Sequence, residues 1–145
     1  MFRSFIGSWQ FWALGSAAFA ALTAIFAKVG VAGVHSDLAT FLRTLVILAL
    51  VATMVWIGGT WQPPAKIPGR TWLFLVLSGL ATGASWLCYF RALKAGDAAR
   101  VAPVDKLSVV LVAIFGVVFL GERLSAAAAL GVALIAAGAV LVAVG

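Results

Sequence analysis

The chain has 145 residues, of which 65% are hydrophobic and 10% are charged, and its mean hydropathy is +1.19. A soluble domain carries about 25% charged residues, because roughly a third of the surface of a chain this long stays in water after folding. The composition therefore excludes a water-soluble globular fold. The net charge is +6, but the basic residues lie at the ends of apolar segments or inside them. We expect them to meet lipid headgroups, and we expect no nucleic-acid partner.

Apolar segments long enough to cross a bilayer follow one another along the chain, separated by turn residues. The first predicted helix spans residues 9–34. It continues past a motif at 18–20 that resembles a signal-peptide cleavage site, so we interpret it as a retained helix. The second predicted helix spans 38–57. The longest loop follows it, and its prolines and glycines at 58–70 cannot continue a helix.

Three more helices are predicted in the second half of the chain. The third spans 71–93. The fourth spans 102–120, with Pro103 in its first turn, where no backbone N–H is needed. The fifth spans 125–144, with Ser125 as its N-cap. Strands are excluded because the apolar runs do not alternate and an open sheet edge cannot exist in lipid.

We therefore predict an all-α integral membrane protein with a single domain over residues 1–145. An odd number of spans places the two termini on opposite sides of the membrane. The loop and helix-end cations on the N-terminal side are Arg3, Lys66, Arg70 and Arg123, and those on the other side are Arg91, Lys94 and Arg100. Four cations against three give almost no orientation preference by the positive-inside rule. This balance favours insertion in both orientations; the alternative is that a partner fixes one of them.

Several charged residues fall inside or at the ends of predicted helices, where each costs about 2.5–3.5 kcal/mol to insert. All of them approach the same membrane face, because odd-numbered helices end there and even-numbered helices begin there. One interpretation is a gate, or a vestibule that attracts anions. The other is that the cations extend to the lipid headgroups. The residues assigned to gating or coupling are Lys28, Arg43, Arg91, Asp105 and Lys106.

The third predicted helix carries a polar stripe of Ser78, Thr82, Ser85 and Tyr89, spaced so that they share one face, with Trp86 beside it. The stripe is interpreted as the wall of a substrate path. The alternative is ordinary packing, with each hydroxyl bonded to its own helix backbone. Two residues on neighbouring helices complete the predicted substrate-binding set, namely Thr23 and Ser108.

The sequence contains no pattern of catalytic or metal-binding residues. Its single histidine, His35, lies at a predicted loop with no nucleophile and no second metal ligand at useful spacing. We therefore expect no enzymatic activity, no metal and no cofactor.

Five stretches, in this order and spacing, resemble the five-helix bacterial/archaeal transporter family of the drug/metabolite transporter superfamily, which has an EamA-like domain. They are residues 19–28, 37–44, 78–93, 103–108 and 119–124. The resemblance covers residues 9–143. It implies a ten-helix fold built from two inverted five-helix repeats, of which this chain supplies one half. An antiparallel homodimer would complete it, with the substrate site near the midplane between the halves.

The resemblance implies a secondary transporter in the cell inner (plasma) membrane that exports small metabolites or drug-like molecules by alternating access. Its expected partners are a second copy of itself, the lipid bilayer and a small-molecule substrate. If protons drive transport, Asp105 is the expected carrier; Glu122, at a turn, is expected to act as a cap. The alternative is a non-transporting helical subunit or scaffold that assembles with a larger membrane partner.

Overall fold

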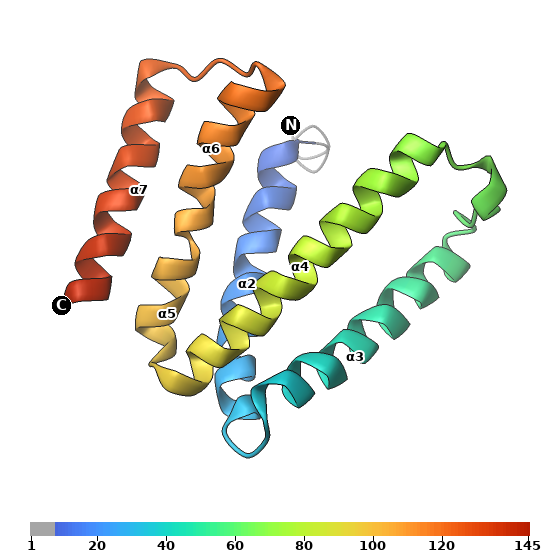
Figure 1. Cartoon of the computed structure of the whole chain (residues 1–145), viewed down its shortest axis with the longest axis horizontal. Helices are drawn as coiled ribbons and strands as arrows, with labels where there is room; N and C mark the ends of the chain where they lie inside the picture. Colours follow the sequence, from blue (N-terminus) through green and yellow to red (C-terminus); the bar gives the residue numbers. More distant parts are fainter. Residues whose placement is uncertain (1–7) are drawn as a thin grey trace. The chain divides into compact units, whose positions relative to one another are not determined.

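A computed structural model describes residues 8–145, and all of its long elements are helices (Figure 1). Of the residues discussed so far, Arg3 lies outside this range. In chain order the elements are α2 (Trp9–Val31), α3 (Ser36–Ile57), the short 3-10 helix η1 (Pro64–Lys66), α4 (Gly69–Ala95), α5 (Ala98–Asp105), α6 (Leu107–Leu120) and α7 (Ala126–Val144).

Five helical segments in the described part of the chain are long and apolar enough to cross a membrane, with α5 and α6 together forming the fourth. Their apolar side chains are mostly uncovered by the protein itself. At most 17% of the residues in the most apolar window of any span are buried. Such large apolar surfaces are stable only in lipid or against other helices. The chain is therefore a multi-pass membrane protein.

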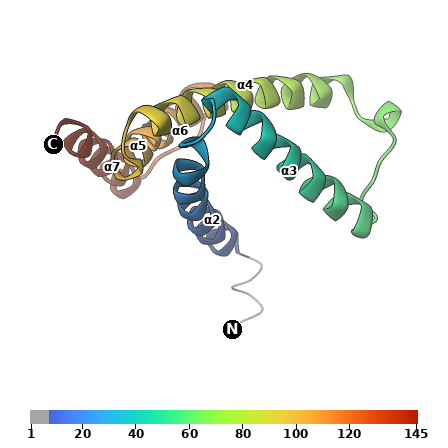
Figure 2. The same cartoon turned by 90° about the horizontal axis from the view of Figure 1, so that it is seen from below.

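The chain divides into two compact units, one containing Ala27–Lys94 and the other containing Ala95–Gly145 together with the described part of Met1–Phe26. In the 27–94 unit, α3 and α4 run in opposite directions. They are close together where α3 begins and α4 ends, and far apart at the loop that joins them (Figure 2). We call the end where α3 begins and α4 ends the closed end of the unit. All buried residues of this unit lie there: Ala27, Val31, Ser36, Thr40, Phe90 and Leu93.

The turn between α2 and α3 differs from its predicted position. The first helix ends at Val31 rather than at residue 34, and the Ala32 N–H closes its last turn on the Val29 carbonyl at 3.3 Å. His35 is the N-cap of α3, and its Nδ1 accepts from the Asp37 N–H at 3.3 Å. Ser36 and Asp37 therefore begin the second helix, because the cap satisfies an N–H that would otherwise lack a partner.

In the other unit, the fourth predicted helix begins earlier than expected and is broken. It starts at Ala98, after Asp97, whose carbonyl accepts from the N–H groups of the residues three and four positions later. Pro103 therefore lies inside α5 and not in a first turn. Its ring has no N–H to donate and crowds the preceding turn. The helix ends at Asp105, and α6 begins after Lys106.

Helices α5 and α6 both pack against α7, and the turn before α7 contains two strong local determinants. Gly121 has φ +69° and ψ +21°, a left-handed conformation that glycine adopts without steric cost. Its N–H and that of Glu122 both point to the Gly116 carbonyl, the latter at 3.0 Å. Ser125 is the N-cap of α7, as predicted, and its Oγ accepts from the Ala128 N–H at 3.1 Å.

The left-handed turn gives a stability prediction. Gly121→Ala should lower the free energy of unfolding by about 1–2 kcal/mol, because a Cβ is disfavoured in this conformation. Gly33→Ala is the matched control: Gly33 also lies in a turn, has no positive φ, and a Cβ there would meet no atom within 4 Å. Unfolding in mixed detergent–SDS micelles, followed by circular dichroism, measures both. Equal stability of the two variants would contradict the assignment.

Candidate functional site

The candidate site lies at the closed end of the 27–94 unit, where the C-terminal turns of α2 and α4 meet the first turns of α3. Four cations and one carboxylate gather here, giving a local net charge of four minus one, or +3. We call these five residues the cationic cluster: Lys28, Asp37, Arg43, Arg91 and Lys94. Asp37 is the single carboxylate between residues 27 and 94.

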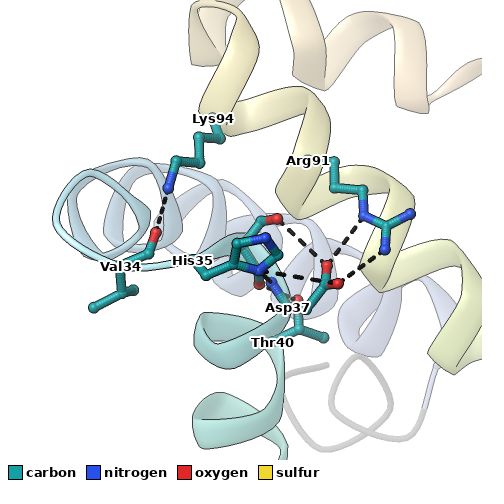
Figure 3. Close-up of polar contacts among 7 residues, drawn as sticks. Val34, His35, Asp37, Thr40, Arg91 and Lys94 are labelled. Atoms are coloured by element: carbon teal, nitrogen blue, oxygen red, sulfur yellow. Dashed lines mark hydrogen bonds and ion pairs between the residues drawn. The ribbon is translucent and has the colours of Figure 1, made fainter.

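An ion pair with two hydrogen bonds joins α3 to α4 in this cluster (Figure 3). Arg91 donates from Nε to Asp37 Oδ1 at 3.0 Å and from Nη2 to Oδ2 at 2.9 Å. The carboxylate lies in the first turn of α3 and the guanidinium near the last turn of α4, so each charge is at the helix end that favours it. Sequence reasoning selected Arg91 but missed its partner. The signal was available, since no other carboxylate occurs in this part of the chain.

Two lysines tie α2 and α4 together reciprocally. Lys28, on the last turn of α2, donates from Nζ to the Leu93 carbonyl of α4 at 2.8 Å. Lys94, on the last turn of α4, donates to the Val34 carbonyl just after α2 (Figure 3). The last carbonyls of a helix lack partners within it and carry partial negative charge. Lys28 thus compensates the end of α4, and Lys94 satisfies a carbonyl of the turn between α2 and α3.

Arg43 and Trp86, which the sequence assigned to different roles, are in contact. The Arg43 guanidinium carbon lies 4.0 Å from the centre of the Trp86 ring and 5.4 Å from that of Phe90. Both rings belong to α4, and the Arg43 side chain is partly buried between the two helices. The guanidinium therefore stacks on an aromatic face, an arrangement typical of arginine.

The polar stripe of α4 is mostly uncovered. Ser78, Thr82 and Ser85 are exposed, whereas Tyr89 and Trp86 are partly buried near the closed end. The Thr82 hydroxyl donates to the Ser78 carbonyl at 2.9 Å. That hydroxyl proton is therefore used by the helix backbone.

The remaining predicted residues belong to the other unit. Thr23 is partly buried on α2, and Ser108 is exposed on α6. Asp105 pairs with its neighbour Lys106 at 3.1 Å, at the break between α5 and α6. The sequence interpretation let Asp105 neutralise one cation of the predicted cluster. The structure agrees, since its partner Lys106 belongs to that predicted set, and Asp37 additionally neutralises Arg91.

An apolar groove of about 290 Å³ lies between α6 and α7, and none of the predicted site residues lines it. Its lining consists of Ala113, Ile114, Val117, Val118, Leu124, Ala129 and Val132. Such a surface suits lipid chains or a neighbouring helix better than a polar solute.

The Asp37–Arg91 pair gives a second prediction. Asp37→Asn and Arg91→Gln should each lower the melting temperature in detergent, and the double variant should lose little more than either single variant, because both break the same contact. The exchanged pair Asp37→Arg with Arg91→Asp should have a melting temperature below that of the wild type, since it places both charges at unfavourable helix ends. Fully additive losses would show that the two side chains do not interact.

Comparison with known proteins identifies the family. The model of the EamA-like transporter family matches residues 7–144. A curated relative from Sinorhizobium sp, described as an uncharacterized transporter in the cobO 3' region, is 73% identical over 137 residues, which cover 94% of this chain and 97% of the relative. No solved structure gives a significant match. Since the family model spans nearly every residue, the chain belongs to the EamA-like transporter family.

Proposed function

We propose that the protein is a secondary transporter of the inner (plasma) membrane that exports small metabolites or drug-like molecules as an antiparallel homodimer. The observation that carries the proposal is the exposed polar stripe of α4. Ser78, Thr82 and Ser85 are uncovered on a helix that spans the bilayer. Hydroxyl groups gain little from acyl chains, so this face is better suited to a partner helix or a polar solute.

A second copy is the partner that best fits this surface. Five spans enclose little space by themselves. The alignment with this five-span chain covers 97% of the curated relative, so the relative adds almost nothing beyond it. An inverted copy would place two α4 stripes on either side of a common pathway, as inverted repeats do in larger transporters. The near balance of four cations against three on the two sides is compatible with both orientations.

The residues divide into two groups in this mechanism. Thr23, Ser78, Thr82, Ser85, Trp86, Tyr89 and Ser108 would line the pathway. The charged residues Lys28, Arg43, Arg91, Asp105 and Lys106 would order the gate at one membrane face. During alternating access one protomer rocks against the other. The contacts that tie α4 to the α2–α3 turn then keep each gate element rigid while it moves.

The orientation proposal predicts that reporters fused to the C-terminus will give signal on both sides of the membrane. Green fluorescent protein, active inside, and alkaline phosphatase, active outside, are the matched pair. Lys66→Gln with Arg70→Gln should shift the ratio of the two orientations relative to the wild type, because it turns an excess of one cation on the N-terminal side into a deficit of one. Lys66→Arg with Arg70→Lys keeps the charge and should not. Signal from one side alone in the wild type would refute dual insertion.

The oligomer is tested separately by light scattering in mild detergent and by cross-linking of single cysteines introduced into α4. An antiparallel dimer gives cross-links between positions at opposite ends of the helix. Cross-links between identical end positions would indicate a parallel pair and overturn the proposed pathway. Purification only with a second membrane protein would favour the non-transporting subunit.

Proton coupling predicts a specific role for Asp105. For a solute shown to move across proteoliposomes, Asp105→Asn should abolish the response of flux to a pH gradient, because the amide cannot carry a proton. Asp97→Asn is the control, since Asp97 precedes the fourth span. Flux that responds to the gradient equally in both variants would remove Asp105 from the mechanism.

A further inference from the structure

Arg43 differs from the other cations of the cationic cluster in what it contacts. Lys28 and Lys94 donate to backbone carbonyls, and Arg91 binds the single carboxylate of the unit. Arg43 has no hydrogen bond or ion pair with any described residue; its guanidinium lies over the rings of Trp86 and Phe90 and interacts electrostatically with Tyr89. Its five N–H donors therefore lack a protein acceptor.

The position of Arg43 makes this lack of an acceptor costly. Arg43 is seven residues after the start of α3, which places its Cα about 10 Å along the helix axis from the membrane face where α3 begins. The side chain is partly buried. A cation held in apolar surroundings needs an anion or strong acceptors to offset its desolvation. The ring faces offset part of this cost, but they leave the N–H edge of the guanidinium unoccupied.

The geometry also indicates which ligand fits. With its guanidinium carbon over the Trp86 ring, Arg43 can still offer its planar fork of N–H groups to the two oxygens of a carboxylate or phosphate. The partly exposed Trp86 ring offers an apolar wall for the rest of the molecule, and the buried Phe90 ring supports the guanidinium from within the unit. The net charge of +3 in the cationic cluster draws anions and disfavours cations.

We propose that Arg43 and Trp86, backed by the buried Phe90, form a binding site for the carboxylate or phosphate of an amphipathic organic anion. The inference rests on the proposed transport function in so far as it names the substrate class. Binding itself does not depend on transport. The same chemistry occurs in the phosphate of a lipid headgroup, so the experiment distinguishes a solute from a lipid.

The test uses purified protein in a nonionic detergent and four probes with one ring in common. Benzoate and phenyl phosphate carry the anion, benzamide is neutral, and benzylamine is a cation. Isothermal titration calorimetry should show binding of at least one anionic probe and of neither control probe. Arg43→Met should weaken that binding about tenfold or more, as expected for loss of a charged hydrogen bond. Arg43→Lys keeps the charge without the fork and should give an intermediate value.

Arg70→Met is the matched control. Arg70 also lies near a ring of α4, with its guanidinium carbon 5.9 Å from the centre of Phe74, but at the far end of the helix from the cationic cluster. Its anion binding should equal that of the wild type. If Arg43→Met fails to fold, Arg43→Lys and Arg70→Met still decide the question. Equal anion binding by the wild type and Arg43→Lys, or no binding of any anionic probe, would overturn a solute site.

The lipid source is tested in nanodiscs of phosphatidylcholine with and without phosphatidylglycerol, using native mass spectrometry. If Arg43→Met loses retained phosphatidylglycerol and the wild type binds no anionic probe, the site holds a lipid and the substrate assignment is wrong. Flux assays separate the two proposals. If Arg43→Met loses probe binding but still transports, the bound anion is not the transported substrate and the transporter proposal stands, whereas probe binding in a protein that transports nothing overturns the transporter.

Discussion

The folded chain depends on how it satisfies cations at the edge of the bilayer. Between residues 27 and 94, four basic side chains gather where α2 and α4 end and α3 begins, and the only carboxylate available is Asp37. Helix ends supply the missing acceptors, because their last carbonyls have no partner within the helix. Lys28 binds such a carbonyl at the end of α4, Lys94 binds the Val34 carbonyl in the turn after α2, and Arg91 binds Asp37. These contacts hold together the one end of this unit that contains buried residues.

Away from that end, the apolar surface of the protein is left for its surroundings. Helices α3 and α4 separate toward their connecting loop, and their outward residues are exposed (Figure 2). In lipid this costs little, because acyl chains are as apolar as leucine and provide no driving force that would press helices together. Surfaces that carry hydroxyls or small residues are the exception, and the α4 stripe is such a surface. The homodimer proposal follows from this difference between the closed polar end of the unit and the separated apolar parts of α3 and α4.

Arg43 has no carboxylate partner because the single carboxylate between residues 27 and 94, Asp37, is bound by Arg91. Membership of the EamA-like transporter family makes a solute pathway the natural context for an unpaired cation. A guanidinium stacked on Trp86 is fixed in place but keeps its hydrogen-bonding edge. A donor set without a protein acceptor is suited to an exchangeable ligand, whereas the bidentate Asp37–Arg91 pair is suited to holding helices together. Two arginines of one cluster therefore serve different purposes.

The membrane class, the number of spans and the family could be predicted without the fold, because continuous apolar runs separated by proline, glycine and charges allow few other structures. The sequence also indicated the cap at Ser125 and selected Arg43 and Trp86. The tertiary structure decided which charges meet. Asp37 and Arg91 are 54 positions apart, and no local period relates them. The break at Lys106 likewise needed the structure, because Pro103 is compatible with a helix start as well as with an interruption. Helix periodicity is a local property, whereas the pairing of charges depends on which helix ends the fold brings together.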